Sequence, residues 1–472
     1  MAINPLIFRE YDVRGVVGQD LTDETVRTLG RAFGTYLRER GERAAMLGRD
    51  CRLSSPQFAS AIADGLTQSG IEVTDLGVVP TPLLYFSLFL AEPDVRLEPK
   101  PDIRAGVMVT GSHNPKDFNG FKLCLGRAAL YGPEIQEVAR IALGGRFASG
   151  RAGVQKLDVV PAYIERVASD ARVRRGLKVV VDAGHGTGGV VAVPLLRRLG
   201  VDVIPLYCEM DGEFPAHHPD PTVPANLADL QREVVARGAD LGVAYDGDAD
   251  RLGIVTERGE IVFGDLVLLI LARALLRENP GAAIVSEVKC SQVLFDEVAR
   301  AGGRAEMWKV GHSLIKARMA EIGALLGGEM SGHIFYRHRW YGFDDAIYSS
   351  VRFLEVLSAH DGPASSLLAG VPGTVTTPEI RIACPDALKF EVVARMTAQY
   401  QQRGFDVIAV DGARVRFDHG WGLVRASNTQ PVLVFRFEAD SEPAVQAIRD
   451  EMITEAERTR AAIEAARPRG EA

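Results

Sequence analysis

The stretch LKVVVDAGHGTGGVVAVPLLRRLGVDVIPL, residues 177–206, contains a strand, a glycine-rich turn, a helix and a second strand in immediate succession. Its first apolar run, at 177–181, has the length of a strand, and the amphipathic segment that follows ends at Gly200. Glycine suits the end of a helix because it readily adopts the left-handed conformation. A second apolar run follows at 201–206. This order and these lengths predict a parallel β-α-β unit.

Two other stretches repeat the pattern. One has strand-like runs at 44–48 and 71–76, the other has them at 282–285 and 304–310, and each encloses a helix closed by glycine. After Pro372 the chain mixes strand-like runs with two helical segments, as in an α+β domain. We therefore predict the α/β fold class, with three similar mixed-sheet α/β domains and a C-terminal α+β domain. The predicted domains are residues 1–152, 153–257, 258–371 and 372–472.

Composition excludes several classes of protein. The 472 residues are 47% hydrophobic and 25% charged, as in ordinary globular proteins, and a net charge of −8 disfavours a nucleic-acid binder. No segment has the length and apolarity of a membrane span, and the N-terminus lacks the pattern of a signal peptide. The five cysteines are scattered, which predicts free thiols. We expect a cytoplasmic protein with neither a nucleic-acid nor a membrane partner.

The most informative segment is Asp246-Gly247-Asp248-Ala249-Asp250-Arg251, which lies between apolar runs at 241–245 and 252–256. Three carboxylates at alternate positions can converge on one hard divalent cation and would repel one another without it. A solvated acidic face is the simpler interpretation, but the flanking strands disfavour it. The segment therefore predicts a metal site.

A calcium-binding EF-hand is the closest rival to this interpretation. Asp246, Asp248, Asp250 and Glu257 match its acidic spacing, but Arg251 stands where that loop needs glycine, and the flanks are strands instead of helices. We reject the EF-hand. Three acidic ligands leave room for further oxygens, which suits Mg²⁺ bridging to a phosphate.

A serine is presented in the segment Val109-Thr110-Gly111-Ser112-His113-Asn114-Pro115, directly after an apolar run at 105–109. A loop at the end of a strand is where α/β proteins place reactive groups. Ser112 can be a nucleophile or the carrier of a covalent group. Taken alone, the segment also fits a surface turn. A Ser-His hydrolase is disfavoured because adjacent residues pair poorly and the Gly-x-Ser-x-Gly elbow is absent.

The turn Gly184-His185-Gly186-Thr187-Gly188-Gly189 fits the Gly-x-Gly-x-x-Gly pattern of dinucleotide-binding proteins. No acidic residue stands at the end of the next strand, the run at 201–206, where the pattern expects one. A structural turn is therefore the preferred interpretation, and a nicotinamide-dependent dehydrogenase stays as an alternative.

Two further loops carry polar groups suited to a sugar phosphate. Gly328-Glu329-Met330-Ser331-Gly332-His333 presents groups that can hydrogen-bond adjacent sugar hydroxyls. Arg425-Ala426-Ser427-Asn428-Thr429 combines a guanidinium with hydroxyls and an amide, which suits a phosphate. Each loop is weak evidence by itself.

Together and in this order, the segments resemble the α-D-phosphohexomutase family, in its phosphomannomutase/phosphoglucomutase branch. The resemblance covers nearly the whole chain, beginning with Phe8-Arg9-Glu10-Tyr11-Asp12-Val13-Arg14-Gly15. It implies four domains around a central cleft, which agrees with the repeats. It also implies a hexose phosphate substrate, a hexose 1,6-bisphosphate intermediate or activator, Mg²⁺, and a monomer or weak homodimer.

The resemblance assigns a role to individual residues. Ser112 matches the phosphoserine, and Asp246, Asp248, Asp250 and the serine's phosphate match the metal ligands. The matches to residues of the transfer site are Arg14, His113, Lys122, Arg251 and His333, with Lys122 and His333 as the candidates for proton transfer. The matches to substrate contacts are Tyr11, Lys289, His312, Glu329 and Ser331, together with Arg425, Ser427, Asn428 and Thr429 for the phosphate that does not react.

These matches predict an isomerase that transfers a phosphoryl group between the 1- and 6-positions of mannose or glucose phosphate. Met330 resembles the residue of the dual phosphomannomutase/phosphoglucomutase branch, whereas phosphoglucosamine mutases typically have Gln there. A phosphoglucosamine mutase, a dehydrogenase and a noncatalytic sugar-phosphate binding protein are the alternatives.

Overall fold

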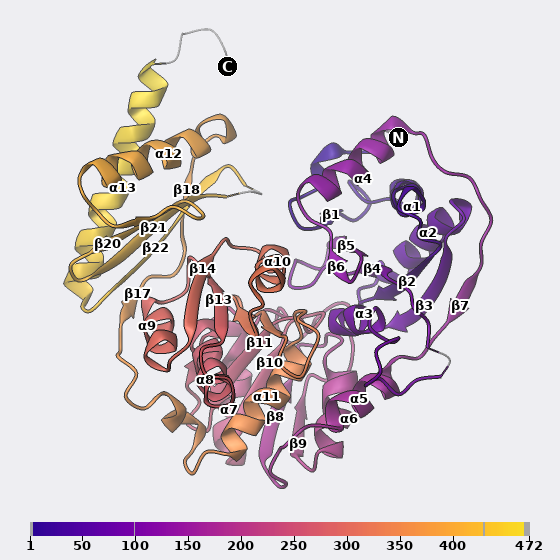
Figure 1. Cartoon of the computed structure of the whole chain (residues 1–472), viewed down its shortest axis with the longest axis horizontal. Helices are drawn as coiled ribbons and strands as arrows, with labels where there is room; N and C mark the ends of the chain where they lie inside the picture. Colours follow the sequence, from indigo (N-terminus) through magenta and orange to yellow (C-terminus); the bar gives the residue numbers. More distant parts are fainter. Residues whose placement is uncertain (1–2, 99, 428–429, 467–472) are drawn as a thin grey trace.

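The computed structural model describes residues 3–98, 100–427 and 430–466 and shows four sheets, each with its own helices (Figure 1). The three β-α-β units expected from the sequence are all present. Gly70, Gly200 and Gly302 follow the three helices with φ of 78°, 83° and 80°, the left-handed conformation for which glycine is suited. The predicted fold class is therefore confirmed.

The first sheet is mixed, with the order β1-β5-β4-β2-β3-β7 and β6 paired with β5. β2, β3, β4 and β7 run parallel, while β1 and β5 are antiparallel to their neighbours. Its strands are β1 (Val13–Val16), β2 (Ala44–Arg49), β3 (Glu72–Val78), β4 (Ala105–Val109), β5 (Phe118–Leu125), β6 (Ala128–Ala129) and β7 (Val154–Lys156). Its helices are α1 (Asp23–Glu39), α2 (Ser55–Gln68), α3 (Thr81–Ser87) and α4 (Pro133–Gly144).

The second and third sheets have the orders β12-β11-β10-β8-β9 and β14-β13-β15-β16. The second comprises β8 (Lys178–Asp182), β9 (Asp202–Leu206), β10 (Leu241–Tyr245), β11 (Leu252–Thr256) and β12 (Ile261–Val262), with α5 (Val160–Ala168), α6 (Gly189–Arg198) and α7 (Ala228–Arg237). The third comprises β13 (Ala283–Glu287), β14 (Arg304–Trp308), β15 (Leu326–Gly328) and β16 (Ile334–Tyr336), with α8 (Gly264–Glu278), α9 (Gln292–Arg300), α10 (His312–Ile322) and α11 (Ala346–Ser358).

The fourth sheet is antiparallel, with the order β17-β22-β21-β20-β19 and β18 paired with β22. It comprises β17 (Val375–Thr376), β18 (Ile380–Ala383), β19 (Val407–Ile408), β20 (Ala413–Phe417), β21 (Gly420–Ala426) and β22 (Val432–Ala439), covered by α12 (Asp386–Gln402) and α13 (Glu442–Ala466). Three short 3-10 turns lie at Pro5–Ile7, Pro224–Leu227 and Ala364–Leu368.

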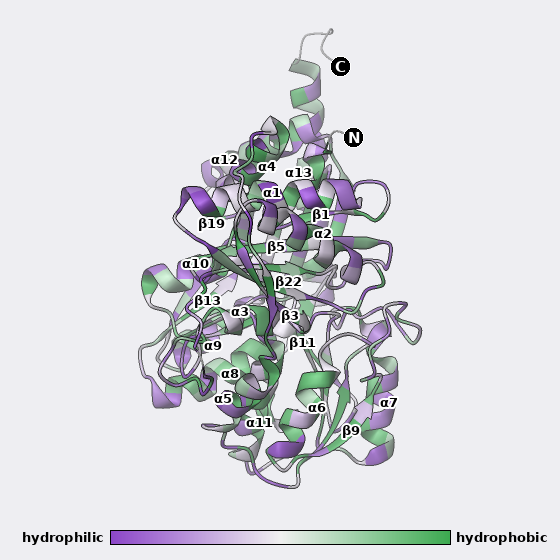
Figure 2. Cartoon of the chain, turned by 90° about the vertical axis from the view of Figure 1, so that its right-hand side faces the viewer, coloured by the Kyte–Doolittle hydropathy of each residue, from purple (hydrophilic) through white to green (hydrophobic). Residues whose placement is uncertain are grey.

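The domains share their hydrophobic cores unequally. One continuous core joins parts of the second and third domains with α3 and one face of the first sheet, whereas the other face of the first sheet and the fourth domain have cores of their own. Smaller clusters lie within the second and third domains. The apolar α8 lies inside this shared core (Figure 2), as expected of a helix that is hydrophobic on most sides. The sheet of the fourth domain contacts the third domain, since Trp421 and Leu423 of β21 cluster with Val288, and Figure 1 shows the fourth domain set apart from the first.

Two strands cross the domain boundaries expected from the sequence. β7 pairs with β3 beyond residue 152, and β12 pairs with β11 beyond residue 257. The division at 152, 257 and 371 stays a prediction. Within the described part of the chain, no helix has the length and apolarity needed to cross a membrane.

Candidate active site

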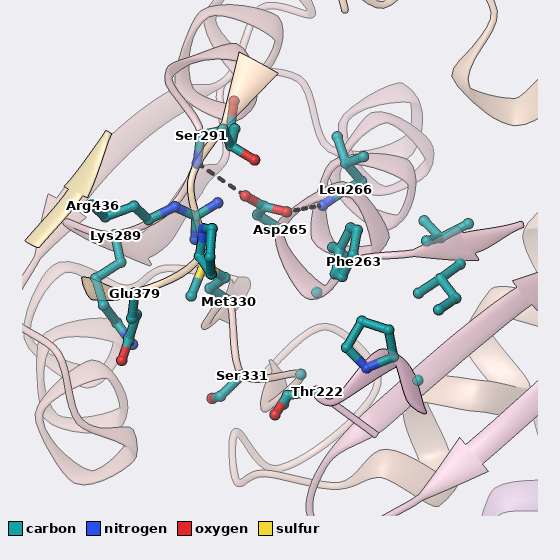
Figure 3. A pocket seen from close by; sticks show the side chains of 18 of the residues that line it. Thr222, Phe263, Asp265, Leu266, Lys289, Ser291, Met330, Ser331, Glu379 and Arg436 are labelled. Carbon is teal, nitrogen blue, oxygen red and sulfur yellow. Dashed lines mark hydrogen bonds and ion pairs between the residues drawn. The ribbon is translucent and has the colours of Figure 1, made fainter. Parts of the chain in front are cut away.

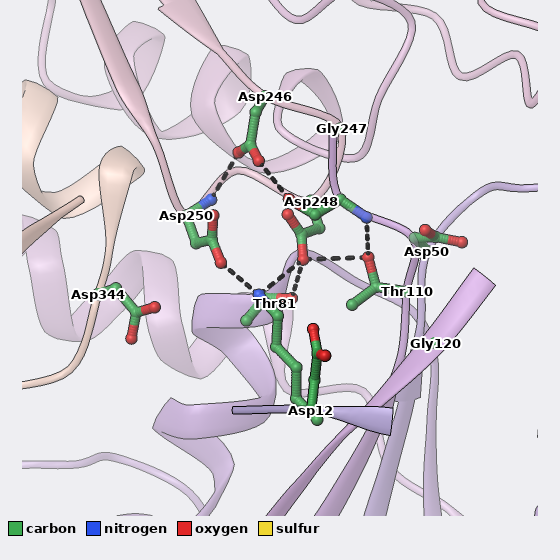
Figure 4. Close-up of polar contacts among 12 residues, drawn as sticks. Asp12, Asp50, Thr81, Thr110, Gly120, Asp246, Gly247, Asp248, Asp250 and Asp344 are labelled. Atoms are coloured by element: carbon green, nitrogen blue, oxygen red, sulfur yellow. Dashed lines mark hydrogen bonds and ion pairs between the residues drawn. The ribbon is translucent and has the colours of Figure 1, made fainter. Parts of the chain in front are cut away.

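The three aspartates lie in the tight turn between the antiparallel strands β10 and β11, and all three are fully buried. Asp246 Oδ1 accepts the backbone N–H groups of Asp250 and Arg251, each at 3.0 Å, which closes the turn. Oxygens of Asp246, Asp248 and Asp250 lie within 4.8 Å of one another (Figure 4). The turn thus brings three carboxylates to one point.

Two threonines and a lysine of the first domain reach this point. Thr81 Oγ1 and Thr110 Oγ1 donate to Asp248 Oδ2 at 2.6 and 3.0 Å, and Lys122 Nζ lies 3.1 Å from the same oxygen and also pairs with Asp250. Burial would lower the pKa of Lys122, but Asp248 and Asp250 hold it above its usual value. Lys122 is therefore a cation held inside the carboxylate cluster.

The carboxylates respond to this environment in opposite ways. Burial, with Asp250 and Asp248 next in importance, raises the pKa of Asp246 well above its usual range. Burial would also raise the pKa of Asp250, but Lys122 and His333 hold it well below. One member of the cluster therefore resists ionisation, as expected where like charges share a buried site.

The cluster fits a hard divalent cation. Asp248 Oδ1 is buried and has no hydrogen-bond partner among the described residues. A buried carboxylate oxygen without a partner is costly, and a cation with oxygen ligands would satisfy it. Asp246, Asp248, Asp250 and Ser112 are the residues that could hold such an ion.

Ser112 lies at this cluster, although 134 residues separate it from Asp246 in the sequence. It belongs to the loop between β4 and β5, is 5% exposed and has a φ of 46°. Its Oγ donates to Asp246 Oδ2 at 2.7 Å and lies 3.1 Å from His113 Nδ1. The serine expected to carry the phosphate and the expected metal ligands are thus in direct contact.

The turn between β15 and β16 brings Glu329, Ser331 and His333 to the same place. His333 Nε2 lies 3.2 Å from Asp250 Oδ1, while Nδ1 lies 3.0 Å from both Glu329 Oε2 and Ser331 Oγ. Burial lowers the pKa of His333, but Asp250 and Glu329 together raise it to about 9. Burial would raise the pKa of Glu329, but His333 lowers it to about 2. His333 is therefore an imidazolium at neutral pH, held by two carboxylates.

This arrangement predicts how His333 titrates in the metal-free protein. Its imidazole NMR signal should titrate with a midpoint of about 9, and Glu329→Gln should move that midpoint toward the ordinary 6.5. The pKa of His333 is higher in the folded protein than in the unfolded chain, so its protonation stabilises the folded state. This contribution is fully present below pH 6.5 and is lost as the pH rises through about 9.

Glu321→Gln removes an exposed carboxylate of the third domain and serves as the control. An unchanged midpoint in Glu329→Gln would show that Glu329 does not set the charge of His333.

Tyr11 and His312 lie where the first and third domains meet. Tyr11 Oη donates to the Val310 carbonyl at 2.8 Å, and its ring centroid lies 6.0 Å from that of His312. The His312 ring lies 5.5 Å from that of His333, and its Nδ1 is 3.4 Å from Asp344 Oδ2. Burial lowers the pKa of His312, which favours the neutral imidazole.

The two arginines expected at the transfer site lie at the rim of the cluster. Arg14 pairs with Asp12 at 2.5 Å and donates to Asn114 Oδ1 at 3.1 Å, and Arg251 Nη1 lies 4.0 Å from Asp220 Oδ1. Both arginines therefore lie close to the Ser112 loop or to the aspartate turn.

A cavity of about 1070 Å³ extends from this cluster between the second, third and fourth domains. His113, Arg251, Lys289 and Ser331 lie in its wall, and Figure 3 shows Lys289 and Ser331 with Met330 along one part of it. Lys289 Nζ pairs with Glu379 at 2.8 Å. The cavity thus connects residues expected at the transfer site with residues expected to contact the sugar.

The expected phosphate loop lies on the fourth domain. Arg425 Nη2 pairs with Asp411 at 3.1 Å, and Ser427 Oγ accepts the N–H of Gln430 at 3.2 Å. Arg425 is 8% exposed and lies outside the described wall of the cavity. Asn428 and Thr429 lie outside the described residues.

Comparison with known families accounts for this geometry. Residues 5–148, 161–259 and 263–374 match the models of phosphoglucomutase/phosphomannomutase alpha/beta/alpha domains I, II and III, and residues 379–455 match the C-terminal domain of the same family. The chain belongs to the phosphoglucomutase/phosphomannomutase family. The resemblance expected from the sequence is confirmed, and the chain is an enzyme of this family.

Individual relatives agree over almost the whole chain. A phosphomannomutase/phosphoglucomutase of Pseudomonas aeruginosa is 46% identical, and the match covers 94% of this chain and 94% of the relative. A phosphoglucomutase of Neisseria gonorrhoeae is 43% identical, and the match covers 94% of this chain and 95% of the relative. A crystal structure of a phosphoglucomutase/phosphomannomutase family protein from Burkholderia thailandensis has 42% identity and a TM-score of 0.91, covering 97% of this chain and 98% of the other.

The glycine-rich turn has a structural role in this phosphohexomutase. Thr187 donates through its backbone N–H and its hydroxyl to the Gly247 carbonyl, at 3.0 and 3.2 Å. A Cβ added at Gly186 would lie 2.5 Å from the same carbonyl oxygen. The glycine-rich turn packs against the aspartate loop and binds its backbone, so its resemblance to a dinucleotide-binding motif is coincidental.

The sequence did not single out the residues that hold these loops in place. Thr81 and Thr110 bind Asp248, Asp344 pairs with His312 and Lys316, and Asp50 and Arg52 contact the Ser112 loop. In the sequence, two opposite charges at 50 and 52 directly follow an apolar strand, and only the structure shows that both are buried.

Proposed function

We propose that this phosphohexomutase transfers a phosphoryl group reversibly between the 1- and 6-positions of mannose or glucose phosphate. Phospho-Ser112 and a hexose 1,6-bisphosphate are the proposed intermediates. The observation that carries the proposal is the 2.7 Å contact of Ser112 Oγ with Asp246, inside a buried three-carboxylate cluster. Relatives named phosphomannomutase/phosphoglucomutase support it.

In the first proposed step, the bond between Ser112 Oγ and phosphorus breaks while the free hydroxyl oxygen of the sugar monophosphate bonds to phosphorus. The hydroxyl proton passes to a protein base, and a proton from a protein acid restores the Ser112 hydroxyl as its bond to phosphorus breaks. The bisphosphate then turns end over end, and the reverse reaction returns its other phosphoryl group to Ser112. Phosphorus, charge and proton are thus conserved over the cycle.

We assign the proton transfer to His333 in preference to Lys122. The acceptor of the hydroxyl proton must be unprotonated, and His333, whose pKa is raised to about 9, loses its proton at lower pH than Lys122, whose pKa the paired aspartates hold above its usual value. A proton carrier works best when its pKa is close to the working pH.

We further propose Mg²⁺ as the metal, held by Asp246, Asp248, Asp250 and the phosphate on Ser112. A bound Mg²⁺ would neutralise charge that develops on the transferring phosphoryl group. Arg14, Arg251 and His113 are the proposed donors around that group, and their positions at the Ser112 loop and aspartate turn support this.

We assign the substrate contacts to the cavity and the fourth domain. Tyr11, Lys289, His312, Glu329 and Ser331 are the proposed sugar contacts, and Arg425, Ser427, Asn428 and Thr429 the proposed site of the nonreacting phosphate. Because one phosphate site and one sugar loop must serve both orientations of the bisphosphate, contacts common to mannose and glucose are favoured. The phosphoglucosamine mutase alternative is less favoured by the relatives that match.

Location and assembly remain proposals as well. We propose a cytoplasmic monomer or weak homodimer whose partner is the hexose phosphate, without a nucleic acid or a membrane. The net charge of −8 supports the first exclusion.

Intact-mass measurement tests the proposed function directly. After incubation with glucose 1,6-bisphosphate, the protein should gain the mass of one phosphoryl group, and peptide mapping should place it on Ser112. Addition of mannose 1-phosphate or glucose 1-phosphate should then discharge Ser112 with formation of the hexose 1,6-bisphosphate, and return of the other phosphoryl group to Ser112 should release the 6-phosphate. Phosphorylation elsewhere, or none, would overturn the proposed mechanism.

A further inference from the structure

A buried arginine holds the loop that carries Ser112. Arg52 lies in the loop between β2 and α2, 60 residues before Ser112, and is 1% exposed. Its Nη1 donates to the carbonyls of Pro115 and Phe118 at 2.7 and 3.0 Å, and its Nη2 donates to those of Ser112 and Asn114 at 2.8 and 2.6 Å. One guanidinium therefore binds four carbonyls of a single loop.

Asp50 completes the attachment from the opposite side. Its Oδ2 accepts the N–H of Gly111 at 2.9 Å and lies 3.3 Å from Arg52 Nε, and its Oδ1 accepts the N–H of Arg52 at 3.0 Å. A Cβ added at Gly111 would lie 2.3 Å from Arg52 Nε, so the loop closes directly over the guanidinium. Phe214 of the second domain covers Arg52, with 5.3 Å from the guanidinium carbon to the ring centroid.

The contact with the Ser112 carbonyl matters because the backbone there is unusual. Ser112 has a φ of 46°, a left-handed conformation that few side chains adopt without support. With its carbonyl bound by Arg52 and its N–H bound to Thr110 Oγ1 at 2.9 Å, the residue is held on both sides. This conformation directs Oγ to Asp246.

A gain in folding stability does not by itself explain why the Asp50–Arg52 ion pair is buried. Burial raises the pKa of Asp50 and lowers that of Arg52, so both charges are desolvated. Buried ion pairs commonly contribute little net stability, because the loss of hydration offsets the attraction. A lysine could not replace the arginine, because its single nitrogen has three donors and lacks the planar fork.

We propose that Arg52 is a positioning residue for phosphoryl transfer, whose guanidinium holds Ser112 in the left-handed conformation that directs Oγ to the carboxylate cluster. The inference rests on the proposed function, because it concerns the geometry of phospho-Ser112. Arg52 itself is not a proposed contact of the phosphate or of the sugar.

The test compares two matched variants, Arg52→Lys and Arg49→Lys. Arg49 lies on the adjacent strand β2 and pairs with Asp75 at 3.3 Å, so Arg49→Lys alters a partly buried ion pair of the same domain away from the Ser112 loop. We expect Arg52→Lys to lower kcat about 100-fold, since a displacement of about 1 Å in a reacting group can cost that much. KM for the sugar phosphate should stay unchanged.

A second variant separates positioning from folding. Arg52→Ala leaves space for a guanidinium ion, and added guanidinium at millimolar concentrations should restore part of its kcat and part of its rate of Ser112 phosphorylation by glucose 1,6-bisphosphate. In Ser112→Ala, added guanidinium should restore neither kcat nor phosphorylation. Thermal unfolding at the same guanidinium concentrations shows how much of each sample is folded.

Equal kcat in Arg52→Lys and Arg49→Lys would overturn the proposal. Loss of folded protein in both Arg52 variants, without rescue by guanidinium, would overturn it in favour of a purely structural role. Failure of the proposed function is distinguishable from both outcomes, because the wild-type protein would then lack transfer and phosphorylation of Ser112.

Discussion

Ser112→Ala is expected to abolish phosphoryl transfer. The substitution removes Ser112 Oγ, which lies 2.7 Å from Asp246 Oδ2 and is the proposed carrier of the phosphoryl group. Loss of a nucleophilic serine that forms a covalent intermediate lowers kcat on the order of 10⁶-fold. A coupled assay with glucose 1-phosphate or mannose 1-phosphate measures the loss, and intact mass should show no phosphorylation.

Ser87→Ala is a suitable control for this experiment. Ser87 is buried in the first domain, and its hydroxyl donates to the Leu84 carbonyl at 2.6 Å. Its loss should cost about 1 kcal/mol of stability and leave transfer intact. If Ser112→Ala kept transfer comparable to that of Ser87→Ala, the phosphoserine mechanism would be wrong.

Asp248→Asn is expected to have the second-largest effect. Asparagine keeps an oxygen for the hydroxyls of Thr81 and Thr110, but it removes one of the three charges that would hold a cation. A Lewis-acidic metal contributes several kcal/mol to such a transfer, and each 1.36 kcal/mol is tenfold in rate, so kcat should fall about 10³-fold. Chelation of divalent metal from the wild-type protein should produce a similar loss.

A magnesium titration distinguishes metal loss from general damage. In Asp248→Asn, the concentration of Mg²⁺ that gives half-maximal activity should rise, while Asp202→Asn, which changes an exposed carboxylate of the same domain, should behave as wild type. Thermal unfolding monitors the fold of both variants. Full activity of the chelated wild-type protein would rule out a required metal.

If Arg425 binds the nonreacting phosphate as proposed, we expect the fourth domain to move during turnover. Arg425 is paired with Asp411, and the fourth domain has a core of its own, separate from that shared by the second and third domains. A substrate phosphate would therefore compete with Asp411 for the Arg425 guanidinium. Movement of the fourth domain toward the cavity would also exclude water, the competing acceptor for phospho-Ser112.

The sequence alone determined the repeated β-α-β units, the class of the fourth domain, and the positions of the reactive segments. These features are local: the periodicity of apolar residues and the closing glycines are written in neighbouring positions, as at Gly70 and Gly200. The same local reading placed Ser112 after a strand and the aspartates between two strands, and the structure has them there. The resemblance to the family then supplied the expected roles.

The tertiary structure decided which of these segments meet. Ser112 and Asp246 are 134 residues apart, Lys122 and Asp248 are 126 apart, and Arg52 and Ser112 are 60 apart, so no local pattern contains their contacts. Arg52 looked like an ordinary polar residue before a helix, and only packing of the β4–β5 loop over it reveals a buried guanidinium with four carbonyl partners. Local hydrophobic periodicity specifies helices and strands. Which charged groups come into contact depends on how the loops and domains pack, and that packing exists only in the folded chain.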